Sequence, residues 1–234
     1  MKQGISPIIL ALDTDELSVA ISWIEATRDS IDVYKVGLEF FLKYGQEGLK
    51  ELAKNGDFEF FLDLKLHDIP HTVSGAVNSI KELEPRFLTV HAAGGSAMIR
   101  AAADAAPNIS ITAVTVLTSL DPDELQKIGI DSTPLDLAGS MARNSVSAGA
   151  LAIVCSPHEV SAIRNLVGSE ITLITPGVRP VDSELGDQSR VMTPQQAMRA
   201  GANFIVIGRP ITSFFLHSPE AMRDRATEIL ESLS

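Results

Sequence analysis

The chain has 234 residues, 45% of them hydrophobic and 21% charged, and its formal net charge is −11. This length is sufficient to bury a large core, and chains of this size commonly form one domain, so we expect a single domain over residues 1–234. A nucleic-acid-binding protein normally carries a basic face, and no run of Lys or Arg occurs here, so the composition argues against a nucleic-acid partner.

The cysteine content and the N-terminal stretch indicate the compartment. Cys155 is the one cysteine, so no disulfide can form within the chain, as is usual in a reducing compartment. The apolar stretch at residues 8–12 ends at Asp13 and is too short for a signal peptide, and no apolar run approaches the ~18 residues of a membrane span. We therefore expect a cytoplasmic protein with no membrane partner. We interpret Cys155, which ends an apolar run, as a small buried hydrophobe rather than a nucleophile.

Short β-branched runs alternate with longer helical stretches along the chain. Strands are expected at residues 8–13, 32–37, 58–66, 86–91, 109–117, 150–155, 171–175 and 204–207. Helices are expected at residues 15–28, 38–55, 72–83, 94–106, 134–148 and 158–166, and from Pro219 to the C-terminus. Within them, Gly45 predicts a break, and Asn55-Gly56 predicts a left-handed helix end. Eight strands alternating with helices favour a (β/α)8 barrel of parallel strands. A doubly wound open sheet is the alternative, although no Gly-x-Gly-x-x-Gly follows the first strand.

The stretch at residues 60–72 gathers three charges at the end of the third strand. Successive strand side chains point to opposite faces, so Asp63 and Lys65 share one face while the leucines between them line the other. Asp68 follows where Pro70 favours a loop. Burying charges is costly unless they are paired, so this grouping predicts a preorganised charged site. The alternatives are a buried structural ion pair and a surface edge strand with one solvated face.

In a barrel, the C-terminal ends of all strands face one pocket, and the barrel hypothesis therefore predicts a single constellation. Its expected members are the polar or special residues at the strand ends: Asp13, Lys35, Asp63, Lys65, His91, Thr118, Pro176 and Arg209. Lys35 has an alternative interpretation as a surface lysine whose stem packs on apolar neighbours.

The segment after the seventh strand predicts an anion site. Residues 176–191 form a long polar loop, and loops longer than ~12 residues in compact domains are usually functional or disordered. Arg179, Gln188 and Arg190 could hold an anion there. Gly208-Arg209 follows the eighth strand, and the loops after strands seven and eight commonly bind phosphate in this fold. The alternative is a surface loop without function.

The histidines do not predict a metal centre. His67, His71 and His91 lack the His-Glu-x-x-His spacing or a similar arrangement of ligands. We therefore expect no metal, and we expect His67 to orient the neighbouring charged groups.

Residues 61–72 closely resemble the signature of the orotidine 5′-phosphate decarboxylase family, with its Asp-x-Lys-x-x-Asp-Ile-Pro-x-Thr motif. The resemblance covers nearly the whole chain in order and extends to residues 12–13, 35–37, 116–119, 175–180 and 207–210. His71 departs from the pattern, since many members have Asn there.

This resemblance implies a (β/α)8 barrel that decarboxylates orotidine 5′-phosphate to UMP and CO₂, without a cofactor or metal, as a homodimer with active sites at the interface. The implied catalytic array is Lys35, Asp63, Lys65 and Asp68, with Asp68 and Thr72 reaching into the partner's site. The implied substrate-binding residues are Asp13, Lys35, Asp63, Ile69, Thr72, Thr118, Ser119, Pro176, Arg179, Gln188, Gly208 and Arg209.

The chemistry suits these residues, because loss of CO₂ leaves negative charge on a ring carbon that has no electron sink. A fixed ammonium such as that of Lys65 can stabilise this charge and then protonate the carbon. Two alternatives remain: a magnesium-dependent sugar-phosphate enzyme of the same barrel group, and a catalytically silent phosphate-ligand binder.

Overall fold

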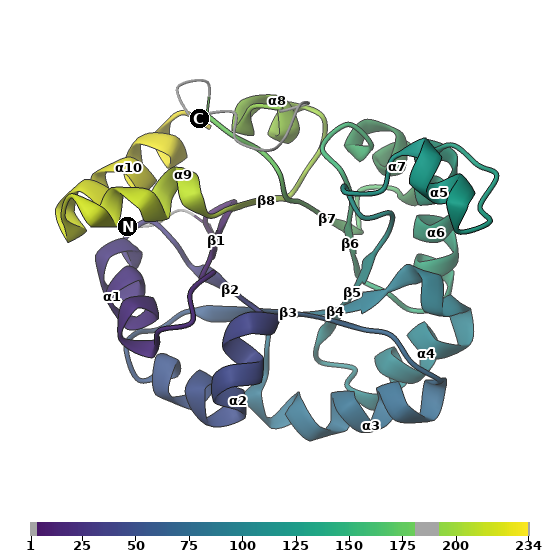
Figure 1. Ribbon diagram of the computed structural model, residues 1–234, viewed down its shortest axis with the longest axis horizontal. Coiled ribbons are helices and arrows are strands. Elements are labelled where there is room, and N and C mark those ends of the chain that lie inside the picture. Colours follow the sequence, from purple (N-terminus) through teal and green to yellow (C-terminus); the bar gives the residue numbers. More distant parts are fainter. Residues whose placement is uncertain (1–3, 181–191, 234) are drawn as a thin grey trace.

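The computed structural model describes residues 4–180 and 192–233. Its strands are all parallel, each pairs with the next along the chain, and β8 pairs with β1 to close a barrel that is ringed by helices (Figure 1). The fold is therefore the (β/α)8 barrel that the sequence predicted. The strands are β1 (Ile8–Ala11), β2 (Val33–Gly37), β3 (Glu59–Leu66), β4 (Phe87–His91), β5 (Ser110–Val114), β6 (Ala152–Val154), β7 (Thr172–Thr175) and β8 (Phe204–Ile207).

The helices alternate with the strands and surround the barrel. They are α1 (Leu17–Thr27), α2 (Leu38–Ala53), α3 (Pro70–Ile80), α4 (Gly95–Ala105), α5 (Pro122–Lys127), α6 (Pro134–Ser147), α7 (Val160–Val167), α8 (Pro194–Arg199), α9 (Arg209–Thr212) and α10 (Pro219–Glu231). Short 3₁₀ turns lie at Lys81–Leu83, Ala92–Gly94 and Ser213–Leu216. None of these helices, in the part of the chain that the structure describes, is long and apolar enough to cross a membrane.

Several boundaries differ from the sequence-based expectation. The short helices α5, α8 and α9 were not predicted, and β5 ends three residues earlier than expected. The break in α2 is confirmed at Gly45, whose φ is 58°. The left-handed end expected at Asn55-Gly56 is wrong, because neither residue has a positive φ. The Asn55 side-chain amide instead donates to the carbonyls of Glu51 and Leu52, so it satisfies the last turn without a left-handed residue.

Two hydrophobic layers hold the barrel together. The outer layer packs the outward faces of the strands against the helices, and it includes Leu62 and Leu64 of β3. The inner layer fills the barrel itself, where the ring of Phe87 contacts Phe61 and Phe204 with centroids 5.7 and 5.5 Å apart. Because these rings fill the part of the barrel interior nearer the N-terminal ends of the strands, the open space lies at the C-terminal ends.

The N-terminal end of the barrel is closed by Arg86. Its guanidinium lies over the rings of Phe87 and Phe204, at 5.3 and 5.5 Å from their centroids, and it pairs with Glu59 at 2.5 Å. The Arg86 charge thus lies against two aromatic rings and is also paired with Glu59. Both contacts lower the free-energy cost of removing this charge from water.

Arg164 of α7 connects the segments that lead into β7 and β8. Its guanidinium donates to the carbonyl oxygens of Gly168, Ile171 and Gly201 and to the side chain of Asn203. Asn203 in turn accepts a hydrogen bond from the N–H of Leu173 at 2.8 Å. This network fixes β7 and β8 relative to each other, and the loops that follow these two strands form one end of the cavity described next.

Candidate active site

A cavity of about 390 Å³ opens at the C-terminal ends of the strands. The residues that were expected there and do line it are Asp13, Lys35, Asp63, Lys65, Thr118, Pro176, Arg179, Gly208 and Arg209. They come from six different strand ends or the loops that follow them, so the barrel assembles this set from segments far apart in the sequence. Asp68, Ile69, Thr72 and Ser119 are exposed and are not among its lining residues. Gln188 and Arg190 lie outside the described residues.

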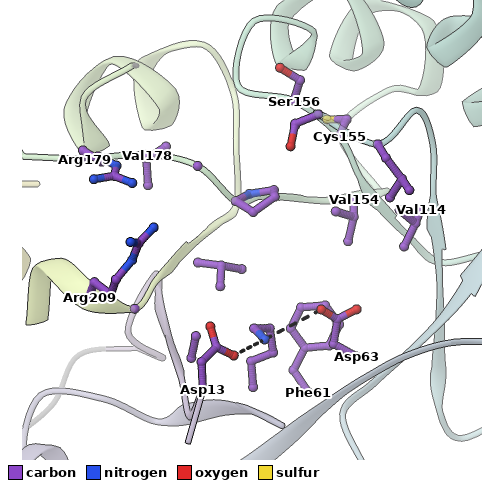
Figure 2. A pocket seen from close by; sticks show the side chains of 18 of the residues that line it. Asp13, Phe61, Asp63, Val114, Val154, Cys155, Ser156, Val178, Arg179 and Arg209 are labelled. Atoms are coloured by element: carbon purple, nitrogen blue, oxygen red, sulfur yellow. Dashed lines mark hydrogen bonds and ion pairs between the residues drawn. The ribbon is translucent and has the colours of Figure 1, made fainter. Parts of the chain in front are cut away.

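Four charged side chains form a continuous alternating row on one side of this cavity. The Asp63 carboxylate lies between two ammonium groups, with Lys65 Nζ 2.8 Å from Oδ1 and Lys35 Nζ 3.8 Å from Oδ2. Lys35 Nζ also lies 2.9 Å from Asp13 Oδ1, and dashed lines in Figure 2 follow this row from Asp13 to Asp63. The side chains of Lys35 and Asp63 are only 12% and 15% exposed. The charges of Lys35 and Asp63 are therefore compensated mainly by their neighbours rather than by water.

The end of β3 is irregular where it presents Lys65. Leu62 pairs with Leu88 of β4, but the next pair is Leu66 with Val90, so β3 holds two more residues than β4 between these pairs. Within this bulge Lys65 has a φ of 48°, a left-handed conformation that is uncommon for a residue with a side chain. The sequence predicted the inward faces of Asp63 and Lys65 but not the bulge.

The row leaves little room beside Lys35. A Cβ atom built on Gly37 would lie 3.3 Å from Lys35 Nζ and 3.8 Å from Asp13 Oδ1. A glycine at the end of β2 therefore lets the backbone approach the charged groups closely.

Two arginines face the cavity from the segments after β7 and β8. Figure 2 shows the guanidinium groups of Arg179 and Arg209 at one end of the cavity, while Asp63 and Phe61 lie at the other. Among the described lining residues there are four cationic side chains and two carboxylates, which gives this cavity a formal charge of +2 in a chain of net charge −11. The cavity thus suits an anionic ligand.

The wall opposite the charged row is formed by residues that the sequence did not indicate. Val154, Cys155 and Ser156 line it at the end of β6, and Val114 adds apolar surface from β5 (Figure 2). Cys155 is 2% exposed, which confirms that it is a buried residue, and this burial raises the pKa of its thiol. Only the position of these residues at or just after the end of a strand could have indicated them.

Glu159 supports this wall from beneath. One of its carboxylate oxygens accepts a hydrogen bond from the N–H of Ser156 at 3.0 Å, and its own N–H donates to the Ser156 carbonyl at 2.9 Å. The side chain is buried, and burial raises the pKa of Glu159 to about 7. A carboxyl that titrates near neutral pH therefore lies directly behind the cavity wall.

The two histidines at the ends of β3 and β4 pair with each other. The rings of His67 and His91 lie 5.4 Å apart between centroids, and neither residue lines the cavity. The expectation that His91 joins the constellation is therefore wrong, because its ring turns toward His67. Burial, together with the neighbouring His67 and Lys65, lowers the pKa of His91. Among the residues that the structure describes, no group of three or more His, Cys, Asp or Glu side chains is placed to hold a metal ion.

The raised pKa of Glu159 predicts a pH-dependent stability. Between its ordinary pKa and about 7, folded Glu159 holds a proton that the unfolded chain releases, so stability falls as pH rises through this window. In Glu159→Gln this dependence should disappear, so the variant should gain stability relative to wild type between about pH 5 and pH 7. Thermal unfolding across this range measures the difference, with the exposed Glu170→Gln as control. Parallel curves for wild type and Glu159→Gln would contradict the prediction.

Known proteins of one family are similar to this chain. Residues 6–214 match the model of a family described as "Orotidine 5'-phosphate decarboxylase / HUMPS family". Proteins named orotidine 5′-phosphate decarboxylase are similar to this chain. The one from Thermobifida fusca is 50% identical, and the match covers 88% of this chain and 89% of that protein. The one from Frankia casuarinae is 46% identical, and the match covers 90% of this chain and 83% of that protein. A crystal structure of orotidine 5′-phosphate decarboxylase from Lactobacillus acidophilus superposes with a TM-score of 0.81 at 33% identity, covering 96% of this chain and 99% of that one. This chain therefore belongs to the orotidine 5′-phosphate decarboxylase / HUMPS family.

Proposed function

We propose that this protein is a carboxy-lyase that converts orotidine 5′-phosphate to UMP and CO₂, the last step of UMP synthesis, as one catalytic domain without a cofactor. The observation that carries the proposal is the position of Lys65. Its ammonium is held 2.8 Å from Asp63 inside a cavity whose other end presents Arg179 and Arg209. A ligand with a phosphate at one end and a reacting anionic group at the other matches this separation of charge.

The substrate would lie across the cavity in one direction. Its phosphate would contact Arg179 and Arg209, with the Gly208 backbone beside it and Gln188 completing the site. Its ribose would lie against Asp13 and Lys35. The pyrimidine would extend toward Thr118 and Ser119, with the face of Pro176 nearby. This orientation places the pyrimidine carboxylate next to Asp63 and Lys65.

The reaction needs stabilisation of charge on carbon. When the bond from C6 to the carboxylate breaks, its electron pair remains on C6 and CO₂ leaves. The Lys65 ammonium would stabilise this carbanion and then transfer its proton to C6, after which it regains a proton from water. The neighbouring Asp63 carboxylate, 2.8 Å away, holds the Lys65 ammonium in place, and it would repel the substrate carboxylate in the ground state. Phosphate binding far from C6 can supply binding energy for this arrangement.

We further propose that the working form is a homodimer in which Asp68, Ile69 and Thr72 complete the partner's site. These residues are exposed at the junction of β3 and α3, and Asp68 accepts a hydrogen bond from the Ile69 N–H at 2.6 Å. Ile69 is 65% exposed and Leu42 of α2 is 79% exposed. A second copy that covers these apolar side chains would bury their surface and bring Asp68 toward the other cavity.

Replacing Lys65 tests the chemical step. Lys65→Ala should lower kcat for orotidine 5′-phosphate by at least about 10⁴-fold, because it removes the charge stabilisation and the proton donor together. The conversion is followed by ultraviolet absorbance with a chelator present, and binding of UMP shows that the variant retains its cavity. Lys50→Ala, which changes an exposed lysine paired with Glu47, is the control. Near-normal turnover by Lys65→Ala would remove Lys65 from the mechanism, and wild-type activity that requires magnesium would favour a sugar-phosphate enzyme.

Replacing Arg209 tests the phosphate end. Arg209→Ala should raise KM for orotidine 5′-phosphate by about 10- to 100-fold, since charge-assisted hydrogen bonds to phosphate are lost. The same variant should change the much weaker turnover of the nucleoside orotidine little. Steady-state kinetics with both substrates, with the exposed Arg143→Ala as control, make this comparison. An equal loss with orotidine would show that Arg209 does not act through the phosphate.

Mixing two inactive variants tests the shared site. If Asp68 acts in the partner's cavity, a hybrid dimer of Lys65→Ala and Asp68→Ala subunits contains one complete site. A fully exchanged equal mixture should therefore recover up to about a quarter of the wild-type specific activity. Each variant alone supplies the baseline, and activity is measured by the same absorbance assay after subunit exchange. A mixture no more active than its components would place Asp68 outside the partner's site.

A further inference from the structure

The bulge at the end of β3 leaves the backbone of Lys65 out of the regular ladder. Pairing with β4 stops at Leu62 and resumes at Leu66, and Lys65 lies between these two points with its left-handed φ of 48°. A backbone N–H in such a place needs an acceptor from outside the ladder. A non-glycine residue also holds this conformation only when its surroundings enforce it.

The acceptor is the side chain of Thr89 on β4. The Lys65 N–H donates to Thr89 Oγ1 at 2.7 Å, a short hydrogen bond for a nitrogen donor. Thr89 is 0% exposed, so water does not compete for this contact. The hydroxyl therefore takes the place that a β4 carbonyl would occupy in an unbroken ladder.

The same hydroxyl also reaches the Asp63 carboxylate. Thr89 Oγ1 lies 3.2 Å from Asp63 Oδ1 and 3.4 Å from the carbonyl oxygen of Leu62, and its hydrogen is best directed to the closer, charged acceptor. Asp63 Oδ1 is the oxygen that binds Lys65 Nζ at 2.8 Å. One hydroxyl thus joins the backbone of Lys65 to the oxygen atom on which the Lys65 ammonium rests.

We propose that Thr89 is a positioning residue for the reaction. Its hydroxyl holds both the Lys65 backbone N–H and the Asp63 carboxylate, and these two contacts fix the location of the Lys65 ammonium. The inference rests on the proposed function of Lys65. Thr89 does not line the cavity, so it acts through Lys65 and Asp63 rather than on the substrate. Small errors in the position of a reacting group are costly, since a displacement of about 1 Å can reduce the rate about 100-fold.

The chemistry of the side chain explains why a hydroxyl is needed here. A hydroxyl accepts from one partner while it donates to another, and threonine restricts its χ1 angle through its β-branch. Valine has the same shape but would leave the Lys65 N–H without this acceptor. Serine retains the hydroxyl and loses only the methyl group.

The chain offers a matched control for this change. Thr112 of β5 stands directly opposite Thr89 in the β4–β5 pairing and is also 0% exposed. Its hydroxyl donates to the carbonyl of Ser110 on its own strand at 2.9 Å and contacts none of the charged groups. Thr112→Val therefore removes a buried threonine hydroxyl next to Thr89 without touching the row.

The experiment compares Thr89→Val, Thr89→Ser and Thr112→Val. Thr89→Val should lower kcat for orotidine 5′-phosphate by about 10- to 100-fold with KM changed by less than about threefold, because the phosphate end is intact. Thr89→Ser should restore kcat to within a few-fold of wild type, and Thr112→Val should match wild type. Hydrogen exchange of the Lys65 amide, followed by NMR, should accelerate in Thr89→Val alone.

The outcomes separate this inference from the proposed function. If the wild-type protein does not turn over orotidine 5′-phosphate, the proposed function is wrong. In that case hydrogen exchange of the Lys65 amide in wild type and Thr89→Val still tests the contact with Thr89. Active wild type with unchanged kcat in Thr89→Val, or equal losses in Thr89→Val and Thr112→Val, would overturn the role of Thr89. Should Thr89→Val fail to fold, the comparison is made between Thr89→Ala and Thr89→Ser, where equal kcat values would overturn it.

Discussion

The position of Asp63 between two lysine ammonium groups is the constraint on which the site depends. Its two carboxylate oxygens face Lys65 and Lys35, and Lys35 is in turn paired with Asp13. Because Lys35 and Asp63 are largely withdrawn from water, removing one member of the row takes away part of the charge compensation of its neighbour. The four charged side chains therefore depend on one another, and the rest of the fold has to hold them at fixed distances.

The barrel meets this requirement through the way it is filled. The rings of Phe61, Phe87 and Phe204 occupy the lower interior, and Arg86 closes the N-terminal end over two of them. The remaining space is thus confined to the C-terminal end. Phe61 belongs both to this inner core and to the cavity lining, so the packed interior forms the bottom of the cavity beside the charged row.

The sequence predicted the barrel and the six charged residues that line the cavity because strand ends carry a local signal. An apolar strand that ends in charges, as at Asp63 and Lys65, can be read from alternation alone. The short helices α5 and α8 escaped prediction because six residues are too few for an apolar period, although Asp121-Pro122 and Thr193-Pro194 are typical helix starts. Thr89 carries no local signal, since its importance arises only from the shifted register between β3 and β4. The same limit applies to His91, whose strand-end position gave no indication that its ring would turn to His67.

At Lys65 the regular backbone of a β-strand is interrupted by the bulge. A regular continuation of β3 would have kept Lys65 in the ladder with its backbone paired to β4. The extra residues instead free the Lys65 backbone, and the buried Thr89 hydroxyl then captures it from the β4 side. The Lys65 side chain, 31% exposed, consequently lies at the edge of the cavity, while its backbone and its carboxylate partner are held by Thr89. A strained residue that is held by buried contacts on one side and open to a ligand on the other is expected where a protein must present a charge at a fixed position.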